Sequence, residues 1–526
     1  MNQQVDAIVI GAGINSMIAA SELALAGWSV TLIDERDRIG GFIASDEITL
    51  PGYIHDTFSS WHPLFVAGEA YGVLGEQLHK HGLEYANTDD AVTASVSTTH
   101  GSVIAHRSVE RTVEGFENPN DRAEYVAMLE QFGEDAPHIF GAMGTELGAK
   151  TVMRLCWQLW RQQKSAGIER MARSVTQSGR GYARQRFDGW EADQLWAPWL
   201  LHAGLAPDQA SGGLMFPVMA ATMHGFGLPV VVGGAGQFVT AFERLFAEHG
   251  VNVITGSRVD SIEVQDGRAV GVRTGGKTLS ASKAVLASTG PRQLYEELLR
   301  DQDVDHQTRV EVARYRPGRG AMQIHVALSA PLSWSDARLN AVPLVHVSSG
   351  SDSTAIACAQ AEAGLLPETP TVVVGQQHVL DPGRVPLGCG SLWIQLQELP
   401  FTPTGDAAGQ LDVADGWTPS VVDGYVDRVF DRIEAHAPGF KLTVRKAVAL
   451  SPADLAQANR NAVNGDPYGG AAELDQNLLW RPTPRTSRHH TAVKGLWHIG
   501  AATHPGPGLG GGSGHYVASR LLAKRL

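Results

Sequence analysis

The first forty residues carry the clearest pattern of apolar and polar positions in the chain. Val5–Ile10 is apolar at all but its second position, which predicts a strand buried on both faces of a parallel sheet. From residue 14 to residue 26, small and apolar side chains recur at helical spacing. Residues 28–33 predict a second strand, which ends on Asp34. The segment is therefore predicted to form a strand–helix–strand unit with the turn Gly11-Ala12-Gly13 at its first junction.

This turn and the residues around it predict a dinucleotide-binding site. Gly11 permits a tight turn, and Gly13 lets a pyrophosphate approach the backbone without a Cβ in its way. The helix that begins near Ile14 offers unpaired N–H groups to the phosphates. In such sites an acid about 20 residues further on holds the ribose hydroxyls, and Asp34 lies at that distance at a strand end. The third glycine-or-alanine position is Ser16, which is small enough for close helix–strand packing.

A second glycine turn imitates the first one later in the chain. Val230–Gly236 reads as a strand and a glycine turn, followed by a predicted helix at 238–249 and a strand at 251–255. That strand ends on Thr255-Gly256-Ser257, without an acid where a ribose would need one. No NAD(P) site is therefore predicted there.

Further strands complete two predicted units. Residues 262–272 predict a hairpin around Asp266-Gly267, and residues 283–289 a buried strand that returns to the dinucleotide-binding sheet. Outside it, alternating apolar positions predict strands at 321–328 and 391–399, and residues 421–437 predict an amphipathic helix.

The chain is predicted to be an α/β protein with two domains built from separated segments. Residues 1–66, 230–290 and 446–526 are expected to form a Rossmann-like domain, which is a parallel sheet with helices. Residues 67–229 and 291–445 are expected to form a mixed α+β substrate domain. Helical periodicity dominates residues 67–229, so this part is predicted to be a helical insertion.

Charge and cysteine content narrow the function. The formal net charge of −13 argues against nucleic acid as a partner. Cys156, Cys358 and Cys389 lie far apart without a CxxC pair, so we expect neither a disulfide framework nor a metal site. The N-terminus enters a strand within five residues, which argues against a signal peptide. A cytoplasmic location is predicted.

Two stretches invite a membrane interpretation. No Asp, Glu, Lys or Arg occurs between Asp208 and Glu243, but prolines and glycines interrupt this stretch, which favours buried core and cavity wall over a spanning helix. Met153–Arg161 has apolar residues at helical spacing beside several basic residues. A weak contact with a membrane surface is one interpretation of that helix. An amphipathic helix that caps the core is favoured over it, because the apolar run is short.

Several motifs resemble one flavoprotein superfamily. Asp34–Gly41 resembles the extended motif of the flavin-dependent amine oxidase and phytoene desaturase superfamily, in which a second glycine pair follows the ribose acid. His55–His62 resembles its segment beside the isoalloxazine ring. The strand Leu496–Gly500 and the Thr503–Gly508 run resemble the C-terminal signature of phytoene dehydrogenase-related oxidoreductases. Amine oxidases usually carry a Glu where this chain has Ala501, which moves the resemblance away from them.

The resemblance implies FAD as the cofactor, bound jointly by the N-terminal and C-terminal motifs. The helix that opens near residue 509 would point at the pyrimidine end of the flavin and stabilise negative charge there. The residues that the resemblance assigns to FAD are Gly11, Gly13, Ile14, Asn15, Ser16, Asp34, Glu35, Arg36, Gly40, Gly41, Phe42, Ser60, Trp61, Val259, Gly500, Ala501, Leu509, Gly510 and Gly511.

The implied reaction removes two hydrogens from a C–C or C–N bond of a small apolar organic substrate. Hydride would go to flavin N5, and dioxygen or a quinone would reoxidise the flavin. His504 is the first candidate for the proton acceptor, followed by His62, Tyr468 and His224. The substrate, the electron acceptor, the oligomeric state and the mode of flavin attachment stay open.

Two alternatives remain. One is a desaturase or isomerase of carotenoids or other polyenes at a membrane surface. The other is a non-enzymatic protein similar to the GDP dissociation inhibitors, which share this fold. Because those proteins tend to lose nucleotide-binding features that this chain keeps, such as Gly11, Gly13 and Asp34, the enzyme is favoured.

Overall fold

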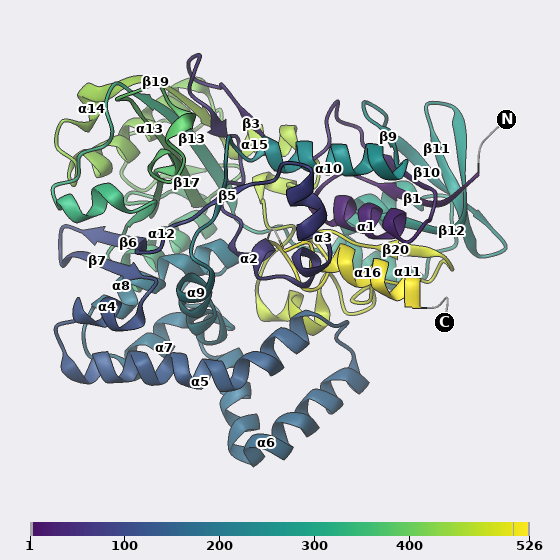
Figure 1. Cartoon of the computed structure of the whole chain (residues 1–526), viewed down its shortest axis with the longest axis horizontal. Coiled ribbons are helices and arrows are strands. Elements are labelled where there is room, and N and C mark those ends of the chain that lie inside the picture. The colour runs from purple at the N-terminus through teal and green to yellow at the C-terminus, as the bar shows by residue number, and fades with distance from the viewer. Residues whose placement is uncertain (1–3, 509, 524–526) are drawn as a thin grey trace.

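The first of two large sheets is built from both ends of the chain. The structure is a computed structural model that describes residues 4–508 and 510–523 (Figure 1). Its parallel strands run in the order β20, β12, β1, β2, β9, and an antiparallel hairpin of β10 and β11 extends β12. Their bounds are β1 Val5–Ile10, β2 Val30–Ile33, β9 Asn252–Ile254, β10 Val259–Gln265, β11 Arg268–Thr274, β12 Lys277–Ala287 and β20 Leu496–His498. The predicted strands and hairpin of this sheet are confirmed.

Four helices bury one face of this sheet. They are α1 Ile14–Leu25, α3 Glu69–Lys80, α10 Gly236–His249 and α16 Gly512–Ala523. Helices α1 and α16 approach each other closely, since a Cβ on Gly514 would lie 1.9 Å from the carbonyl oxygen of Asn15. The first residues of α1 and α16 therefore lie together beyond the carboxyl ends of β1 and β20, the edge where parallel sheets bind ligands.

The second sheet is mixed and has the strand order β19, β13, β17, β16, β14, β6, β7. The apolar face of α13 (Pro419–Glu434) covers it, with Val421, Tyr425 and Val429 in the shared core. The bounds of its strands are β6 Ala91–Ser97, β7 Gly101–His106, β13 Gly320–Leu328, β14 Leu344–Val347, β16 Val372–Gly375, β17 Gly390–Leu399 and β19 Val444–Leu450.

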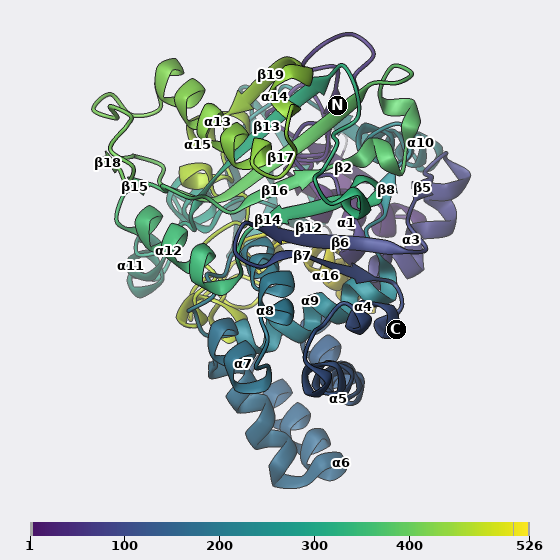
Figure 2. The same ribbon diagram turned by 90° about the vertical axis from the view of Figure 1, so that its left-hand side faces the viewer.

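A layer of helices lies below the second sheet (Figures 1 and 2). It contains α4 Val109–Glu114, α5 Pro119–Met143, α6 Ala149–Thr176, α7 Gly179–Arg186, α8 Glu191–Trp196 and α9 Gly212–Phe226. Lys164 has non-helical backbone angles and divides α6 into two segments, which project from the body as an arm. Most of the uncharged α9 is buried, as predicted. Among the described residues, no helix combines the length and the apolar character needed to cross a bilayer.

Short elements connect these layers. The helices are α2 Pro63–Val66, α11 His306–Ala313, α12 Ser351–Glu362, α14 Phe440–Thr443 and α15 Pro452–Ala458, and a π-helical turn spans Gln293–Leu298. The short strands pair as β3 (Ser45–Asp46) with β4 (His55–Asp56), β5 (Tyr85–Ala86) with β8 (Val230–Val231), and β15 (Leu365–Leu366) with β18 (Gly405–Asp406).

The predicted α/β class is confirmed, while the division into two domains stays a proposal whose boundaries we adjust. Leu74 and Leu78 of α3 pack into the core of the first sheet, although residue 67 was predicted to start the other domain. The turn at 293–298 packs on the opposite face of the first sheet. Strand β19 pairs with β13 of the second sheet, so the predicted start of the last segment at residue 446 is too early.

Candidate functional site

A cavity of about 550 Å³ lies where the two sheets meet the helical layer. The first sheet contributes Gly13 and Gly500, the second contributes Gln323 and Gln395, and α9 contributes Met219. A smaller cleft of about 110 Å³ continues it along the carboxyl ends of β1 and β2, and the two share lining residues. Together they form one long site with a narrow end and a wide end.

The two predicted glycine turns meet at the junction of cleft and cavity. Gly13 has an extended backbone (φ −74°), and no atom lies within 4 Å of the position that its Cβ would take. A Cβ on Gly41, whose φ is +59°, would lie 3.2 Å from the Cα of Gly13. Because Gly13 is also the N-cap of α1, the unpaired N–H groups of that helix lie beside this open space. The arrangement suits an anion such as a diphosphate.

The side chain of Asp34 holds these turns in place. Its carboxylate accepts hydrogen bonds from the backbone N–H of Ala12 at 2.6 Å and of Arg36 at 2.8 Å. Arg36 in turn donates to the carbonyl of Gly41 at 2.6 Å. Burial raises the pKa of Asp34, and the two backbone N–H donors oppose that shift. A carboxylate has about four acceptor positions, so Asp34 can still accept from a ribose hydroxyl.

The C-terminal motif joins the same site through Ser513. The Ser513 hydroxyl accepts from the N–H of Gly500 at 2.8 Å and donates to the side-chain oxygen of Asn15 at 2.9 Å. This contact fixes the start of α16 against the start of α1. Ile14, Asn15 and Ala501 line the cavity beside it.

Most residues assigned to the cofactor line the cleft or the cavity. These are Gly11, Gly13, Ile14, Asn15, Asp34, Glu35, Arg36, Gly40, Gly41, Phe42, Ser60, Trp61, Val259, Gly500 and Ala501. Ser16 is buried and does not line either. Gly510 and Gly511 do not line them either, and Gly511 serves packing, since a Cβ there would lie 1.9 Å from the side chain of Ile18. Leu509 lies outside the described residues.

The glycine turn at residues 233–236, which resembles a second nucleotide site, binds carboxylates of the protein itself. The N–H of Ala235 donates to Asp56 at 2.6 Å, and the N–H of Gly233 donates to Asp381 at 2.7 Å. Arg384 bridges both acids, at 2.6 Å to Asp56 and 2.9 Å to Asp381. All three charged side chains are buried. We call Asp56, Asp381 and Arg384 the buried ionic cluster; it occupies the turn that otherwise imitates a nucleotide site.

Three of the four candidate proton acceptors lie outside the cavity lining. The ring of His504 contacts the carbonyl of Ala142 at 2.9 Å, and that of His62 contacts the Tyr85 hydroxyl at 2.9 Å. His224 contacts the Tyr125 hydroxyl at 2.7 Å. Burial lowers the pKa of His504 to about 4 and that of His62 to about 3. Because none of these three rings lines the cavity, we withdraw His504, His62 and His224 as proton acceptors.

Tyr468 does line the cavity, but as a neutral group. Its hydroxyl accepts a hydrogen bond from the Gln397 amide at 2.5 Å, which leaves the hydroxyl proton free to donate. Burial raises the pKa of Tyr468 far above its ordinary value. At neutral pH it is a hydrogen-bond donor and not a proton acceptor.

The loop before α6 is anchored beside His504 by Glu146. The Glu146 carboxylate accepts from the N–H of His489 and from the Arg520 guanidinium, both at 2.9 Å. Burial alone would raise the pKa of Glu146, but these hydrogen bonds outweigh it and lower the pKa to about 2 from 4.5. The ion pair therefore stabilises the fold above pH 4.5, and this stabilisation is lost as the pH falls towards 2.

Replacing Glu146 with glutamine is expected to cost about 1–2 kcal/mol of unfolding free energy at pH 7, since solvent around the partly exposed Arg520 screens the ion pair. The cost should shrink as the pH falls below 4.5. Urea unfolding at several pH values measures it. Glu130→Gln, at an exposed position on α5, is the control. A cost independent of pH would contradict the assignment.

Sequence reasoning missed much of the wide end of the cavity. Trp393, Gln395 and Gln397 alternate along β17 and face it, and Trp199 and His202 enter from the helical layer. The signal in β17 was the pair Gln395 and Gln397, which alternate with the apolar Ile394 and Leu396. Nothing local marked Trp199 or His202.

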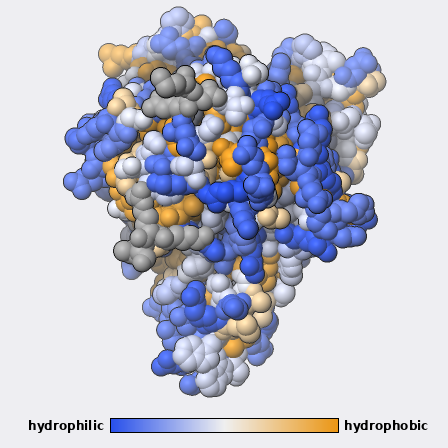
Figure 3. All heavy atoms as spheres, turned by 90° about the vertical axis from the view of Figure 1, so that its right-hand side faces the viewer, coloured by the Kyte–Doolittle hydropathy of each residue, from blue (hydrophilic) through white to orange (hydrophobic). Residues whose placement is uncertain are grey.

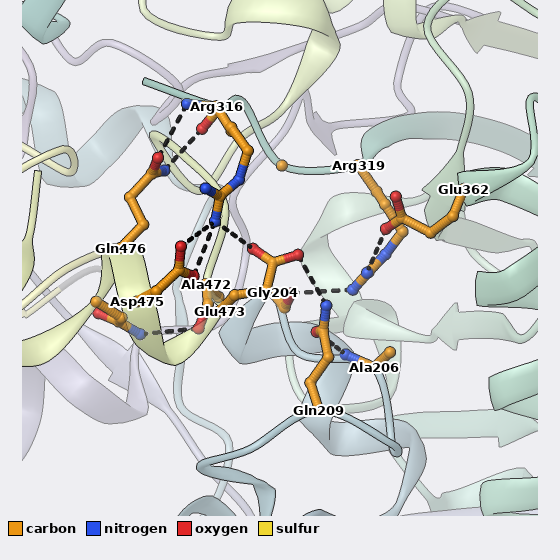
Figure 4. Close-up of polar contacts among 12 residues, drawn as sticks. Gly204, Ala206, Gln209, Arg316, Arg319, Glu362, Ala472, Glu473, Asp475 and Gln476 are labelled. Atoms are coloured by element: carbon orange, nitrogen blue, oxygen red, sulfur yellow. Dashed lines mark hydrogen bonds and ion pairs between the residues drawn. The ribbon is translucent and has the colours of Figure 1, made fainter. Parts of the chain in front are cut away.

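An ionic network braces the wall at this end (Figure 4). Arg316 pairs with Asp475 at 2.9 Å, and Gln209 donates to Glu473 at 3.0 Å. Arg319 donates to the carbonyl of Gly204 at 2.9 Å. The network ties together loops from the helical layer, the second sheet and the C-terminal segment, which carry cavity-lining residues such as Tyr315 and Tyr468.

Comparison with known proteins identifies the family. A family model described as "Flavin containing amine oxidoreductase" matches residues 17–358. The chain belongs to this family. It is an FAD-dependent oxidoreductase. This result favours the predicted enzyme over the inhibitor-like alternative.

Individual relatives resemble this FAD-dependent oxidoreductase over nearly its full length. The rat (Rattus norvegicus) pyridine nucleotide-disulfide oxidoreductase domain-containing protein 2 is 26% identical, covering 98% of this chain and 93% of that protein. A phytoene desaturase (neurosporene-forming) of Rhodobacter capsulatus is 23% identical with the same coverage. The crystal structure of an oxidoreductase from Methanosarcina mazei shares the fold, with a TM-score of 0.64 and 14% identity over 99% of both chains.

The residues of the oxidoreductase fit FAD. Gly13 leaves open the space that a diphosphate requires, and Asp34 lies at the narrow end of the site. Around the cavity, buried polar atoms lack hydrogen-bond partners, among them the Trp61 indole nitrogen, the Thr289 hydroxyl and the Gln323 side-chain oxygen. Buried polar groups are rarely left unpaired, so these atoms indicate a bound molecule rich in nitrogen and oxygen, as isoalloxazine is.

A buried cation lies behind Ala501. The Arg481 guanidinium donates to the carbonyls of Ala501 and Tyr468, both at 2.8 Å, and makes no ion pair within the described residues. Burial lowers the pKa of Arg481, while Tyr315 and Asp466 oppose that shift. Arg481 thus places a positive charge directly behind Ala501, which lines the cavity. This charge favours negative charge in the neighbouring part of the cavity.

Proposed function

We propose that this oxidoreductase removes two hydrogen atoms from a C–C bond of a small, uncharged, mainly apolar organic molecule. The observation that supports this is the lining of the cavity. Trp199, Trp393, Met219, Met223 and Leu228 supply apolar surface. Among the described lining residues the one carboxylate is that of Asp466, and three backbone N–H groups already donate to it.

A protonated amine would therefore find no ionic partner in this cavity, and burying an unpaired charge is costly. This disfavours the C–N alternative, as does Ala501 at the position where amine oxidases usually carry a Glu. Dehydrogenation of a C–C bond needs no charged recognition group. A hydroxyl or carbonyl on the substrate could bond to Gln397 or Tyr468, which lie side by side.

When bound, FAD would supply the hydride acceptor at its N5, and dioxygen or a quinone would reoxidise it. The protein orients the substrate and excludes water. As one carbon gives up hydride, its neighbour loses a proton, and the electrons of that C–H bond form the new double bond. A carbon next to the site of hydride loss is acidic, so a weak base suffices.

His202 is the candidate for that base. It is the imidazole among the described lining residues, and its Nε2 lies 3.1 Å from Nε2 of the buried His346. Burial lowers the pKa of His202 to about 3, so the ring is neutral at neutral pH and keeps a lone pair. The contact with His346 fixes the orientation of the ring, which makes His346 a positioning residue.

Replacing His202 with glutamine is expected to lower kcat by about 100-fold, because proton transfer loses its acceptor. FAD content and KM should change little. His504→Gln and His62→Gln, which alter buried imidazoles outside the cavity, are the comparison variants and should keep kcat. Stopped-flow reduction of the flavin measures the step, and an equal loss in either comparison variant would contradict the role of His202.

Anaerobic flavin bleaching tests the substrate class. Purified holoenzyme is mixed with cyclic alkenes, terpenes, polyenes, and primary and secondary amines at neutral pH. We expect uncharged substrates to bleach the flavin at least about 100-fold faster than amines of similar size, since an amine must lose its proton before entering. The proposal would be overturned if amines bleached the flavin rapidly and alkenes did not bleach it at all. Reoxidation with dioxygen or a soluble quinone then identifies the acceptor.

A carotenoid or other long polyene is the second candidate, and the relationship to a phytoene desaturase favours it. The cavity of about 550 Å³ must hold the flavin ring as well as the substrate. This volume, within the ordinary range for small-molecule sites, favours the smaller substrate. Faster flavin bleaching by polyenes than by terpenes or cyclic alkenes would favour this second candidate.

A further inference from the structure

The first segment of the α6 arm exposes a stripe of large apolar residues. Met153, Trp157 and Trp160 are 63%, 55% and 48% exposed and recur at helical spacing, so they share one side of the helix. Leu159 faces inward and is buried. The predicted core-capping role therefore does not hold for this stripe, which we call the arm stripe.

The arm is basic within an acidic protein. Helix α6 contains six basic residues and one acidic residue, whereas the whole chain has a formal net charge of −13. Arg170 pairs with Asp135 of α5 at 3.0 Å, so the first segment and the kink carry the cations that concern the stripe. The guanidinium of Arg161 lies 4.9 Å from the centre of the Trp157 ring, and the ammonium of Lys164 lies 5.2 Å from that of Trp160. Cationic and aromatic groups thus share one surface. The projection at the bottom of Figure 3 likewise mixes hydrophobic and hydrophilic residues.

The arm is connected to the candidate substrate cavity through one helix. α6 packs against α9, where Leu214, Val218 and Ala221 form a cluster with Met171 of α6. From the same α9, Met219 and Met223 line the cavity. The second segment of the arm therefore lies one helix away from the cavity wall, and the kink at Lys164 joins it to the segment that carries the stripe.

We propose that the arm stripe docks the protein on the surface of an anionic lipid bilayer. Tryptophans prefer the bilayer interface, and each nearby Lys or Arg adds attraction to anionic lipids. The charge of α6 and its kink at Lys164 exclude insertion across the membrane and fit a helix lying in the interface. An apolar substrate would then be drawn from the bilayer; this consequence rests on the proposed function, but the docking does not.

Vesicle co-sedimentation of the full holoenzyme, without substrate, tests the docking. Vesicles of phosphatidylcholine alone are compared with vesicles containing about one third phosphatidylglycerol. We expect binding to the anionic vesicles at least about tenfold stronger, and weaker binding as salt screens the charges. Trp157→Ala/Trp160→Ala should reduce binding at least about tenfold, and Arg154→Gln/Arg161→Gln should remove most of the preference for anionic lipid.

The matched control is Lys441→Gln/Leu442→Ala, which removes one basic and one exposed apolar residue from α14, far from the arm (Figure 1). Its binding should equal that of the unaltered protein. Sedimentation velocity tests whether the arm stripe binds a second copy of the protein instead of a bilayer. If the unaltered protein is an oligomer that binds neither kind of vesicle, and Trp157→Ala/Trp160→Ala makes it a monomer, the stripe is a contact between copies and the proposal is wrong. Equal binding to neutral and anionic vesicles would also overturn it.

Discussion

Replacing Gly13 with valine is expected to weaken FAD binding strongly and leave the apoprotein folded. The backbone of Gly13 is extended, a conformation open to any residue, and its Cβ would enter empty space. That space is where the diphosphate must approach the N-terminus of α1. Loss of two charge-assisted hydrogen bonds corresponds to at least about a 100-fold weaker FAD affinity. The apoprotein should lose at most about 1 kcal/mol, from the poorer N-cap.

Titration of apoprotein with FAD, followed by flavin fluorescence, measures the affinity, and urea unfolding measures the stability. Gly72→Val is the matched control, because Gly72 lies in α3 of the same unit and its Cβ would also meet no atom. Gly13→Ala should give an intermediate loss. If Gly13→Val binds FAD normally, the diphosphate does not lie at this turn and the cofactor site must be placed elsewhere.

Replacing Arg384 with methionine is expected to destabilise the protein by about 3–5 kcal/mol. The change leaves the carboxylates of Asp56 and Asp381 buried without their shared cation. Asp56 also accepts from the Ser60 hydroxyl, and Ser60 and Trp61 line the cavity. The variant should therefore lose FAD at a lower urea concentration as well.

Urea unfolding of the apoprotein measures the first effect, and flavin release measures the second. Arg338→Met is the control, since Arg338 forms an exposed ion pair with Asp336 that should be worth less than about 1 kcal/mol. Adding Asp56→Asn to Arg384→Met should recover part of the loss, because one unpaired charge disappears. A loss below about 1 kcal/mol for Arg384→Met would show that the buried ionic cluster does not support the fold.

His504 and His202 show that a sequence motif can predict the position of a backbone segment but not the direction of its side chains. The motif around residues 500–506 predicted a backbone segment at the site, and Gly500 and Ala501 line the cavity. It could not give the direction of the His504 side chain, which turns towards Ala142 in a distant helix. His202, by contrast, comes from a segment with no recognisable motif. Its place follows from packing against His346 of the second sheet.

The sequence alone determined the strand–helix–strand unit, the fold class and the cofactor. The unit and the fold class follow from local periodicity and from turns such as Gly11–Gly13, where backbone geometry depends on residues close together in the chain. FAD followed from the resemblance of Asp34–Gly41 and of the C-terminal motif to one flavoprotein superfamily. The sequence also predicted no nucleotide site at the turn 233–236. It could not say what the turn binds, because Asp381 and Arg384 lie far away in sequence.

Only the tertiary structure decided the chemistry of the cavity and the exposure of the arm. The wide end combines side chains from two sheets and a helical layer, and no spacing along the chain encodes which of them face one another. The same holds for Trp157 and Trp160, whose helical spacing suits a buried face or an exposed one equally well. Which face is buried depends on the elements that pack against it, and these are set by long-range contacts.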